Sequence, residues 1–291
     1  MQIIFHTGAH CTDDDLLLRC LLRNKEEFSA RGIAVPGPGK YRSLLKDAFA
    51  AMDKAEPASD ARDVLIDAIL DDEVADRLIM SNEHFFGSQR FAIEGNILYP
   101  LAGQRLGQLR ALFPFDQIEV FMAIRNPAGF LPLVLAKAAP KRVREVLEAT
   151  DPRTLRWSQT LSRIRDAVPD IPLTVWCNED TPLIWGQILR EIAGIEHGQT
   201  IAGGFDILYE IMSREGIRRL RGYLGQHPDM TEMQRRRVIA AFLDKYAIEE
   251  AVEDELDLPG WTHELVEEMS ELYDEDAFRI QRIPGVQMIA P

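Results

Sequence analysis

Cysteine is scarce in this chain, with three residues among 291 (Cys11, Cys20 and Cys177) and no CxxC pair. Disulfide-stapled scaffolds and zinc ribbons both need paired cysteines, so the sequence excludes both classes. We therefore expect a reducing compartment, the cytoplasm. No apolar run approaches the ~20 residues of a membrane-spanning helix, and the first residues lack the basic segment of a signal peptide. We expect no contact with a membrane.

Positive charge is also in short supply, with 33 Lys and Arg against 47 Asp and Glu. A nucleic-acid-binding protein neutralises phosphates with clustered Lys and Arg, so we expect no nucleic-acid partner. The acidic excess is concentrated between Glu249 and Asp276, which hold 13 acidic residues and no Lys or Arg. Such a run is typical of a solvated face, and the alternative is a contact surface for a basic partner. Arg218, Arg219, Arg221 and the run Arg235–Arg237 are interpreted as facing this segment within the chain.

What the sequence does contain is the mixture of a soluble globular protein, with 46% apolar and 27% charged residues. Five short apolar runs predict strands. Most of them are apolar in succession rather than alternating, which is typical of strands covered on both faces. The five runs are Gln2–His6, Ile33–Pro36, Arg77–Ser81, Glu119–Arg125 and Pro172–Cys177.

Helical patterns separate these strands. They cover Asp14–Arg31, Asp60–Asp72, Tyr99–Phe113, Thr154–Val168 and Thr181–Ala193. The alternation predicts βαβ units and an α/β fold, with a mostly parallel central sheet flanked by helices. After about residue 200 we find helical patterns but no strand pattern. We therefore predict an α/β domain over residues 1–200 and a helical C-terminal subdomain or lid over residues 201–291.

The most informative segment is the loop after the first predicted strand. The strand runs through Gly8 into a helix that we expect to begin near Asp13. At this position of an α/β fold, the N–H groups and the dipole of a helix N-terminus bind phosphates. The loop offers the hydroxyls of Thr7 and Thr12 but no lysine, and aspartates occupy positions 13 to 15. A site for a small polar ligand is therefore expected here.

Residues 5–24 (FHTGAHCTDDDLLLRCLLRN) resemble the first motif of the sulfotransferase family, especially of its bacterial members. In that family the first strand leads into a 5′-phosphosulfate loop of the form H-x-G-x-x-K-[ST]-G-[ST]-[ST], which His6, Gly8 and Thr12 match. Three later stretches resemble the family in the same order. They are LIMSNEHFFG (78–87), VFMAIRNPAGFLPLVL (120–135) and LTVWCNEDTPLIWGQILREIAGI (173–195). The resemblance thus covers about residues 2–195, with the fold of the P-loop superfamily.

The resemblance implies a reaction and a set of site residues. Members of the family bind 3′-phosphoadenosine 5′-phosphosulfate and transfer its sulfuryl group to a hydroxyl or amine. Glu83 and His84 follow the third strand, where a general base can reach an acceptor hydroxyl; the alternative is a satisfied polar pair. Arg125 corresponds to the arginine that holds the 3′-phosphate, and the alternative is a pair with a carboxylate. The residues implied for the donor are Thr7, Gly8, His10, Cys11, Thr12 and Arg125.

The chain departs from the family's motif in the loop itself. The lysine position is Cys11, and the serine position after the arginine is Leu133. Positions 13 to 15, a glycine and two hydroxyl residues in the family, are aspartates. A carboxylate ~4 Å from a phosphate costs roughly 1 kcal/mol in water and up to ~4 kcal/mol at an effective dielectric constant near 20. Two hypotheses follow: a sulfotransferase-like transferase, or a non-catalytic binding or interaction protein whose donor site is disabled by Asp13, Asp14 and Asp15.

The aspartates also have a purely structural interpretation. Thr12 or Asp13 can cap the helix, and Asp15 stands three residues after Thr12, as in a capping box. The alternative is a cation site or a hydroxyl-binding pocket built from His10, Cys11 and the aspartates. No residues show metal-ligand spacing, so we assign no metal ligand. The sequence permits a homodimer without requiring one.

Overall fold

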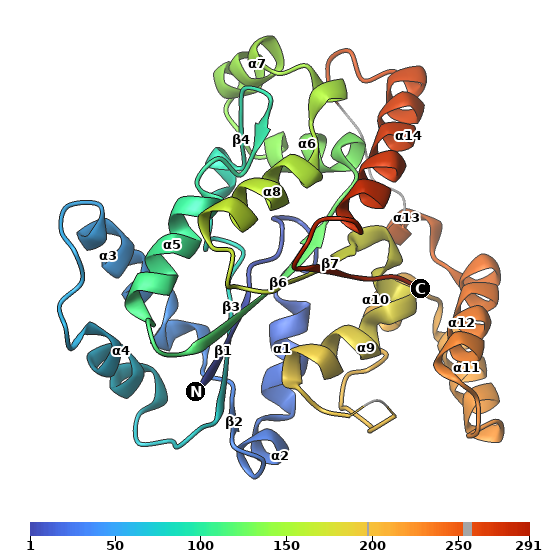
Figure 1. Ribbon diagram of the computed structural model, residues 1–291. Helices are drawn as coiled ribbons and strands as arrows, with labels where there is room; N and C mark the ends of the chain where they lie inside the picture. Colours follow the sequence, from blue (N-terminus) through green and yellow to red (C-terminus); the bar gives the residue numbers. More distant parts are fainter. Residues whose placement is uncertain (197, 253–257) are drawn as a thin grey trace.

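A central six-stranded sheet organises the computed structural model, which describes residues 1–196, 198–252 and 258–291 (Figure 1). All neighbouring strands run parallel, in the order β2-β3-β1-β6-β7-β8. This confirms the predicted α/β fold with a parallel central sheet flanked by helices. The strands are β1 (Gln2–His6), β2 (Ile33–Ala34), β3 (Arg77–Ser81), β6 (Gln117–Ile124), β7 (Leu173–Cys177) and β8 (Val286–Ile289).

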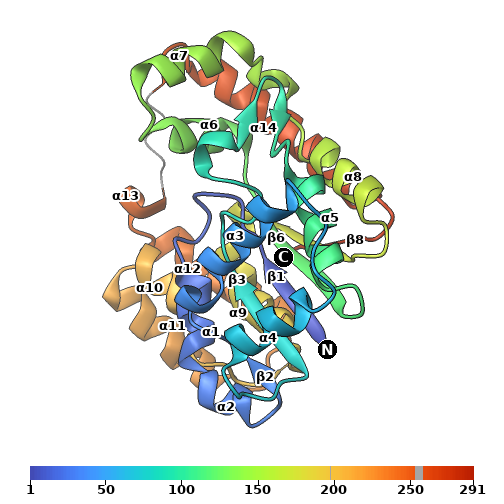
Figure 2. The same cartoon turned by 90° about the vertical axis from the view of Figure 1, so that its left-hand side faces the viewer.

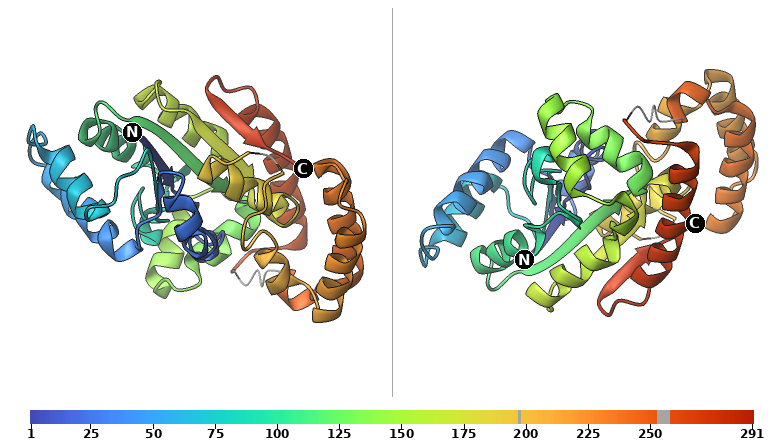
Figure 3. Two further views of the ribbon diagram at one scale, coloured as in Figure 1. Left: turned by 90° about the horizontal axis from the view of Figure 1, so that it is seen from below. Right: turned by 90° about the horizontal axis from the view of Figure 1, so that it is seen from above.

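The strands are apolar on both faces because helices cover both faces (Figure 3). Ile3 and Phe5 of β1 contact one apolar cluster and Ile4 contacts the other, because successive side chains of a strand point to opposite faces. The helices on the Phe5 face are α3 (Arg42–Met52), α4 (Ala61–Leu70), α5 (Ala102–Leu112) and α8 (Trp157–Ala167). Those on the Ile4 face are α1 (Leu16–Arg23), α2 (Lys25–Ser29) and α9 (Thr181–Ala193).

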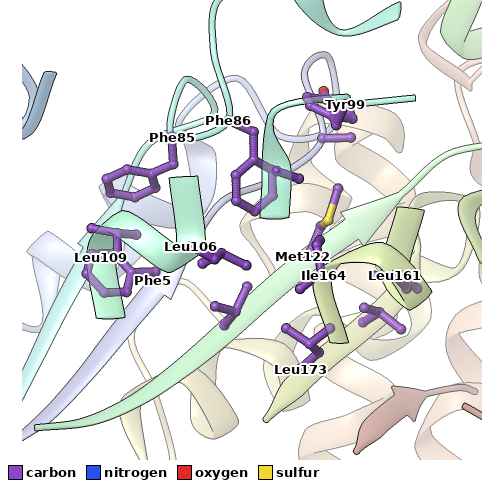
Figure 4. Close-up of a cluster of buried hydrophobic side chains, with 14 of the residues drawn as sticks. Phe5, Phe85, Phe86, Tyr99, Leu106, Leu109, Met122, Leu161, Ile164 and Leu173 are labelled. Carbon is purple, nitrogen blue, oxygen red and sulfur yellow. The ribbon is translucent and has the colours of Figure 1, made fainter. Parts of the chain in front are cut away.

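The larger apolar cluster lies between the sheet and helices α5 and α8 (Figure 4). Leu109 of α5 packs near Phe5, and Ile164 of α8 lies near Met122 of β6. Phe5 also meets Phe85 edge to face, with ring centroids 5.2 Å apart. These five side chains are at most 1% exposed. Full burial of such a side chain contributes about 1.5–3 kcal/mol, so this layer holds β1 and β6 firmly in register.

The helices predicted before residue 200 are all present, most of them with shifted bounds. The helix predicted at Thr181–Ala193 is confirmed to the residue as α9, whereas the one predicted over residues 14–31 is two helices that meet at Asn24. The amide of Asn24 donates to the carbonyls of Cys20 and Ala202, which fixes the break. Two helices before residue 200 that the pattern missed, besides α3, are α6 (Pro127–Leu135) and α7 (Pro140–Ala149). Nearly every residue of α6 is buried, so it shows no polar stripe to reveal its period.

The prediction that no strand follows residue 200 is wrong. β8 pairs in parallel with β7 and forms the edge of the sheet, next to the C-terminus in Figure 1. Only the last residue of β8, Ile289, is buried, so this short strand has no apolar run. A small hairpin of β4 (Ile93–Glu94) and β5 (Ile97–Leu98) was also missed.

The helices after residue 200 divide between two places. A hairpin of α11 and α12, with α10, forms its own small apolar cluster, whereas α14 packs on α6 and α8 (Figures 1 and 2). The predicted boundary at residue 200 stays a prediction. These helices are α10 (Asp206–Ile211), α11 (Arg214–Gln226), α12 (Glu232–Tyr246), α13 (Glu249–Val252) and α14 (His263–Ile280). Part of the acidic segment, residues 253–257, lies outside the described residues.

No helix in the described parts of the chain is long and apolar enough to cross a membrane. Cys11, Cys20 and Cys177 are all free thiols. The cytoplasmic location stays a prediction.

One acidic residue of α14 acts as a cap for α8. Asp276 is 1% exposed, and its carboxylate accepts hydrogen bonds from the backbone N–H of Ser158, at 3.0 Å, and from the Ser158 hydroxyl. The N–H groups of a first helical turn have no partner within the helix, and a carboxylate there also favours the helix dipole. A residue of the acidic segment thus has a structural role.

We expect Asp276→Ala to lower the free energy of unfolding by about 1–3 kcal/mol, because it leaves a buried N–H group and a hydroxyl without their acceptor. The matched control is Glu275→Ala on the same helix. Its carboxylate is 64% exposed, and its one ion pair among the described residues is across one turn with Arg279, so the expected loss is about 0.5 kcal/mol or less. Urea unfolding of the two variants measures the difference, and equal losses would contradict the assigned cap.

Candidate functional site

The candidate site lies at the carboxyl edge of the sheet, around the end of β1. The chain leaves β1 toward β2 on one side, and it later crosses from β3 to β6 on the other side of β1. Ligands of parallel α/β folds bind at such a switch point, outside the carboxyl ends of the strands. The predicted site residues follow β1, β3 or β6, so the fold gathers them at this edge.

Several residues of the loop after β1 have left-handed backbone conformations, with positive φ angles. Gly8, Cys11, Asp14 and Asp15 have φ angles of 57°, 60°, 44° and 62°. A cysteine in this region costs about 1–2 kcal/mol, and such strain is concentrated at functional sites. Because of these turns α1 begins at Leu16, so the helix start predicted near Asp13 is wrong.

The aspartates of the loop are bound by the protein itself. The Asp13 carboxylate accepts the N–H of Leu17 at 3.0 Å, as a cap does. The Asp15 carboxylate takes two hydrogen bonds from Arg42, at 2.5 and 3.1 Å. Helix N–H groups that a phosphate would use are therefore partly satisfied from within the chain.

The hydroxyls of the two threonines of the loop contact backbone carbonyls, and their predicted role in ligand binding stays a prediction. The hydroxyl of Thr12 donates to the carbonyl of Ala9 at 2.8 Å, so the predicted Thr12 cap and its capping box are wrong. Thr7 is 1% exposed, and its hydroxyl faces the carbonyls of Gly8 and Phe121. Both hydroxyls shape the loop.

Cys11 replaces the loop lysine and is half-buried. Burial raises the pKa of its thiol to about 11, and the nearby carboxylate of Glu83 acts in the same direction, while Arg125 and Lys137 lower it. The thiol is therefore protonated at neutral pH. Arg125 donates to the carbonyl of Cys11, which ties the end of β6 to the loop. Burial also raises the pKa of Asp13, to about 6, against the effect of its hydrogen bond to Leu17.

A line of hydrogen bonds joins the loop to the segment after β3. His10 is fully buried, and its Nδ1 lies 2.7 Å from the hydroxyl oxygen of Tyr99, whose ring is stacked on it. Its Nε2 lies 2.9 Å from Nδ1 of His84, a half-exposed side chain. The Nε2 atom of His84 in turn lies 3.7 Å from Oε1 of Glu83.

The direction of these bonds follows from the donors present. The Tyr99 oxygen accepts the backbone N–H of His10 at 2.8 Å, and among the described residues Nδ1 of His10 is the one acceptor within hydrogen-bond distance of the hydroxyl, so we assign the Tyr99 proton to that bond. His10 then carries its proton on Nε2 and donates to Nδ1 of His84. His84 carries its proton on Nε2, the nitrogen nearest to Glu83. Burial lowers the pKa of His10 to about 3, so this imidazole is neutral at ordinary pH.

Glu83 stands at the end of this line and beside the loop. A Cβ atom placed on Gly8 would lie 3.7 Å from Cβ of Glu83, so the glycine allows the two segments to approach. Burial raises the pKa of the Glu83 carboxyl, and the aspartates of the loop add to this, whereas His84 opposes it. A carboxylate with a raised pKa is a better proton acceptor near neutral pH.

A cavity of about 580 Å³ opens beside His84, between α3 and the segment after β3. Its walls include the aromatic rings of Phe49, Phe85 and Phe91. Phe91 is 46% exposed, as expected of a wall that a ligand could cover. Arg42 and Lys46 lie at the same cavity, so it combines apolar walls with positive charge. Binding cavities for small molecules have this composition.

The structure thus brings most of the predicted residues together but shows partners that the sequence did not reveal. Tyr99 was missed because it is 89 residues from His10 in sequence, and its one local signal is the proline that follows it. Arg42 was missed because nothing near it in sequence marks it as the partner of Asp15. Within residues 1–196, 198–252 and 258–291, no three His, Cys, Asp or Glu side chains are grouped to hold a metal ion.

Comparison with known proteins finds no family model, no curated protein and no solved structure that matches this chain. The resemblance to the sulfotransferases stays a prediction from the motifs.

The hydrogen-bond line gives a prediction on tautomers. In ¹⁵N NMR spectra at pH 8 we expect both His10 and His84 to carry their proton on Nε2. Tyr99→Phe removes the donor to His10 Nδ1, so mixed tautomers should appear at both rings, and the free energy of unfolding should fall by about 1–3 kcal/mol. Tyr223→Phe on the exposed surface of α11 is the control. Protonation of His84 on Nδ1 in the unmodified chain would contradict the assigned direction.

Proposed function

We propose that this chain is a binding protein for a small hydroxyl-bearing molecule, whose hydroxyl lies between His84 and Glu83. The observation that carries the proposal is the line Tyr99–His10–His84, which directs the Nε2–H group of His84 toward the Glu83 carboxylate. A hydroxyl can accept one hydrogen bond and donate another. A hydroxyl at this point accepts from His84 and donates to Glu83, so both groups are satisfied by one ligand atom.

The geometry also supports a proposal on how the ligand is oriented. The cavity beside His84 has aromatic walls, so it suits a flat apolar body that carries the hydroxyl at one end. The 3.7 Å between His84 Nε2 and Glu83 Oε1 is longer than a normal hydrogen bond, which is consistent with two groups that share a third partner. Glu83, with its raised pKa, is the group that would take a proton from the hydroxyl.

The loop after β1 supports binding without a phosphosulfate donor. The Asp13 carboxylate accepts a hydrogen bond from the helix N-terminus, where a phosphate would bind, and the Asp15 carboxylate accepts hydrogen bonds from Arg42. The sulfotransferase motif has a lysine at position 11, which neutralises charge on the phosphosulfate. In this chain the residue is Cys11, whose thiol is protonated and carries no charge. In this proposal the loop positions His10 and contributes no cofactor contact.

The probe for the proposed site is 2-naphthol, with 2-methoxynaphthalene as the analogue that cannot donate a hydrogen bond. We expect 2-naphthol to bind at least tenfold more tightly, because the analogue leaves the Glu83 carboxylate without a donor. Glu83→Ala should bring the two affinities within about twofold, and Glu94→Ala on β4 should leave the ratio unchanged. Fluorescence titration of the unmodified chain and both variants with each compound measures these ratios.

Two further variants locate the bound ring. Ala50 lies on α3 in the cavity wall, and its neighbour Ala51 is exposed outside it. We expect Ala50→Trp to abolish 2-naphthol binding by filling the cavity, while Ala51→Trp retains it. Equal affinity for both naphthalene compounds, or binding that survives Ala50→Trp, would refute the site.

Sulfuryl transfer from 3′-phosphoadenosine 5′-phosphosulfate is a second candidate. The observation that favours it is the presence of two cations, Arg125 and Lys137, close enough to Cys11 to lower the pKa of its thiol. These side chains would supply the charge that the loop lysine supplies in the sulfotransferase family, and Glu83 would be the base for the acceptor hydroxyl.

Calorimetric titration with 3′,5′-adenosine bisphosphate separates the two candidates. On the main proposal we expect no binding up to millimolar ligand, because carboxylates oppose the phosphates at the loop. Micromolar binding that is lost in Arg125→Ala would instead support sulfuryl transfer. Whether or not the bisphosphate binds, the titrations with the naphthalene compounds test the proposed hydroxyl site separately.

A further inference from the structure

A second cavity, of about 170 Å³, lies between α9 and α12, in a different part of the molecule from the β1 loop. Figure 1 shows these helices on the side of the sheet away from α3 and α4. The cavity is also lined by residues of the loop that follows α9, namely 198–201 and 204–205. The cavity thus lies at the contact between the α/β part of the chain and the α11–α12 hairpin.

Three arginines and one glutamate are the charged residues among the described residues that line this cavity. Arg190 comes from α9, and Arg235, Arg236 and Glu232 come from α12. The sequence analysis interpreted the run Arg235–Arg237 as facing the acidic segment, and this is wrong for two of them. Arg235 lies 3.9 Å from Glu232, and Arg236 donates to the side chain of Gln187 and the carbonyl of Ala290.

The guanidinium of Arg190 is only partly satisfied. The side chain of Arg190 is 9% exposed, and its Nη2 donates to Glu232 at 3.1 Å. Its Nε–H is buried and has no partner in the described part of the chain, and the same holds for Nε–H of Arg235. Buried donors in native proteins are nearly always paired, so two unpaired guanidinium donors on one cavity indicate an absent acceptor.

The charge balance indicates what that acceptor is. Three guanidinium groups face one carboxylate, so the lining has two positive charges in excess. Arginine binds oxyanions through parallel N–H groups in a planar fork. Gly186 leaves room at the same place, since a Cβ on it would lie 3.3 Å from Nη1 of Arg190.

We propose that the cavity between α9 and α12 is a binding site for a small, doubly charged oxyanion of the phosphate class. The anion accepts hydrogen bonds from Arg190 and Arg235 and thereby joins the α11–α12 hairpin to α9. The site is independent of the hydroxyl site proposed above.

Calorimetric titration of the full chain with inorganic phosphate at pH 8 and constant ionic strength tests the proposal, with sodium nitrate as a singly charged control anion. We expect phosphate to bind and nitrate to bind at least tenfold more weakly. A parallel titration with adenosine 5′-monophosphate distinguishes a free ion from a phosphate ester. Tighter binding of the ester assigns the site to phosphate esters, and tighter binding of phosphate assigns it to the free ion.

The variant that tests the residues is Arg235→Gln. Among the described residues Arg235 has one long ion pair, with Glu232, and its loss leaves Arg190 paired with the same carboxylate. We expect this variant to weaken phosphate binding at least tenfold. Arg237→Gln on the same helix is the matched control, since Arg237 is exposed and does not line the cavity, and its affinity should stay within twofold.

Thermal unfolding gives a second measurement that does not depend on the calorimeter's sensitivity. At a phosphate concentration near the Kd of the unmodified chain, phosphate should raise the melting temperature of the unmodified chain and of Arg237→Gln clearly more than that of Arg235→Gln. An absence of phosphate binding, or equal binding by the two variants, would overturn the proposal.

Discussion

The site depends on the register of β1 between its two neighbours. Phe5 is opposite Met80 of β3 and Val120 of β6, and His6 is opposite Ser81 and Phe121. A slip of one residue would turn every side chain of the strand to the other face, and both faces are filled with apolar groups. The strands β1, β3 and β6 therefore end at fixed heights. The loop after β1, the segment after β3 and Arg125 meet because of that register.

The buried histidines near the end of β1 are neutral, and each has Nδ1 at hydrogen-bond distance from a hydroxyl oxygen, although Nε2 of His6 has no partner among the described residues. His6 is 2% exposed, its Nδ1 lies 2.8 Å from the hydroxyl of Ser81, and burial lowers its pKa to about 4. His10 and Tyr99 form the second such pair. Neutral groups avoid most of the cost that burial imposes on a charge. In the hydrogen-bond line Tyr99–His10–His84–Glu83, the charged group is the last one, Glu83, which lies nearer the surface than His10.

Charge is thus separated between two regions of the molecule. The loop after β1 contains three aspartates. The carboxylate of Asp13 accepts a helix N–H group and that of Asp15 accepts from Arg42, and the adjoining region suits a hydroxyl. The cavity between α9 and α12 collects guanidinium groups with too few carboxylates, which suits an oxyanion. The net charge of −14 conceals this separation, since it is an average over the whole chain. Each region attracts a ligand of different chemistry.

The sequence by itself determined the fold class, the ends of β1, β3 and α9, and the edge of the sheet at which Gly8, Glu83 and Arg125 meet. It did so because apolar periodicity, glycines and chain order record burial and backbone hydrogen bonds locally. The tertiary structure alone decided the place of β8, whose half-exposed residues carry no strand pattern, and that of α6, whose burial on all sides conceals its period. It also decided the long-range partners: Tyr99 for His10, Arg42 for Asp15, and Glu232 of α12 for Arg190. Such pairs depend on how distant segments pack, and no local pattern records the residue that a side chain will meet across the fold.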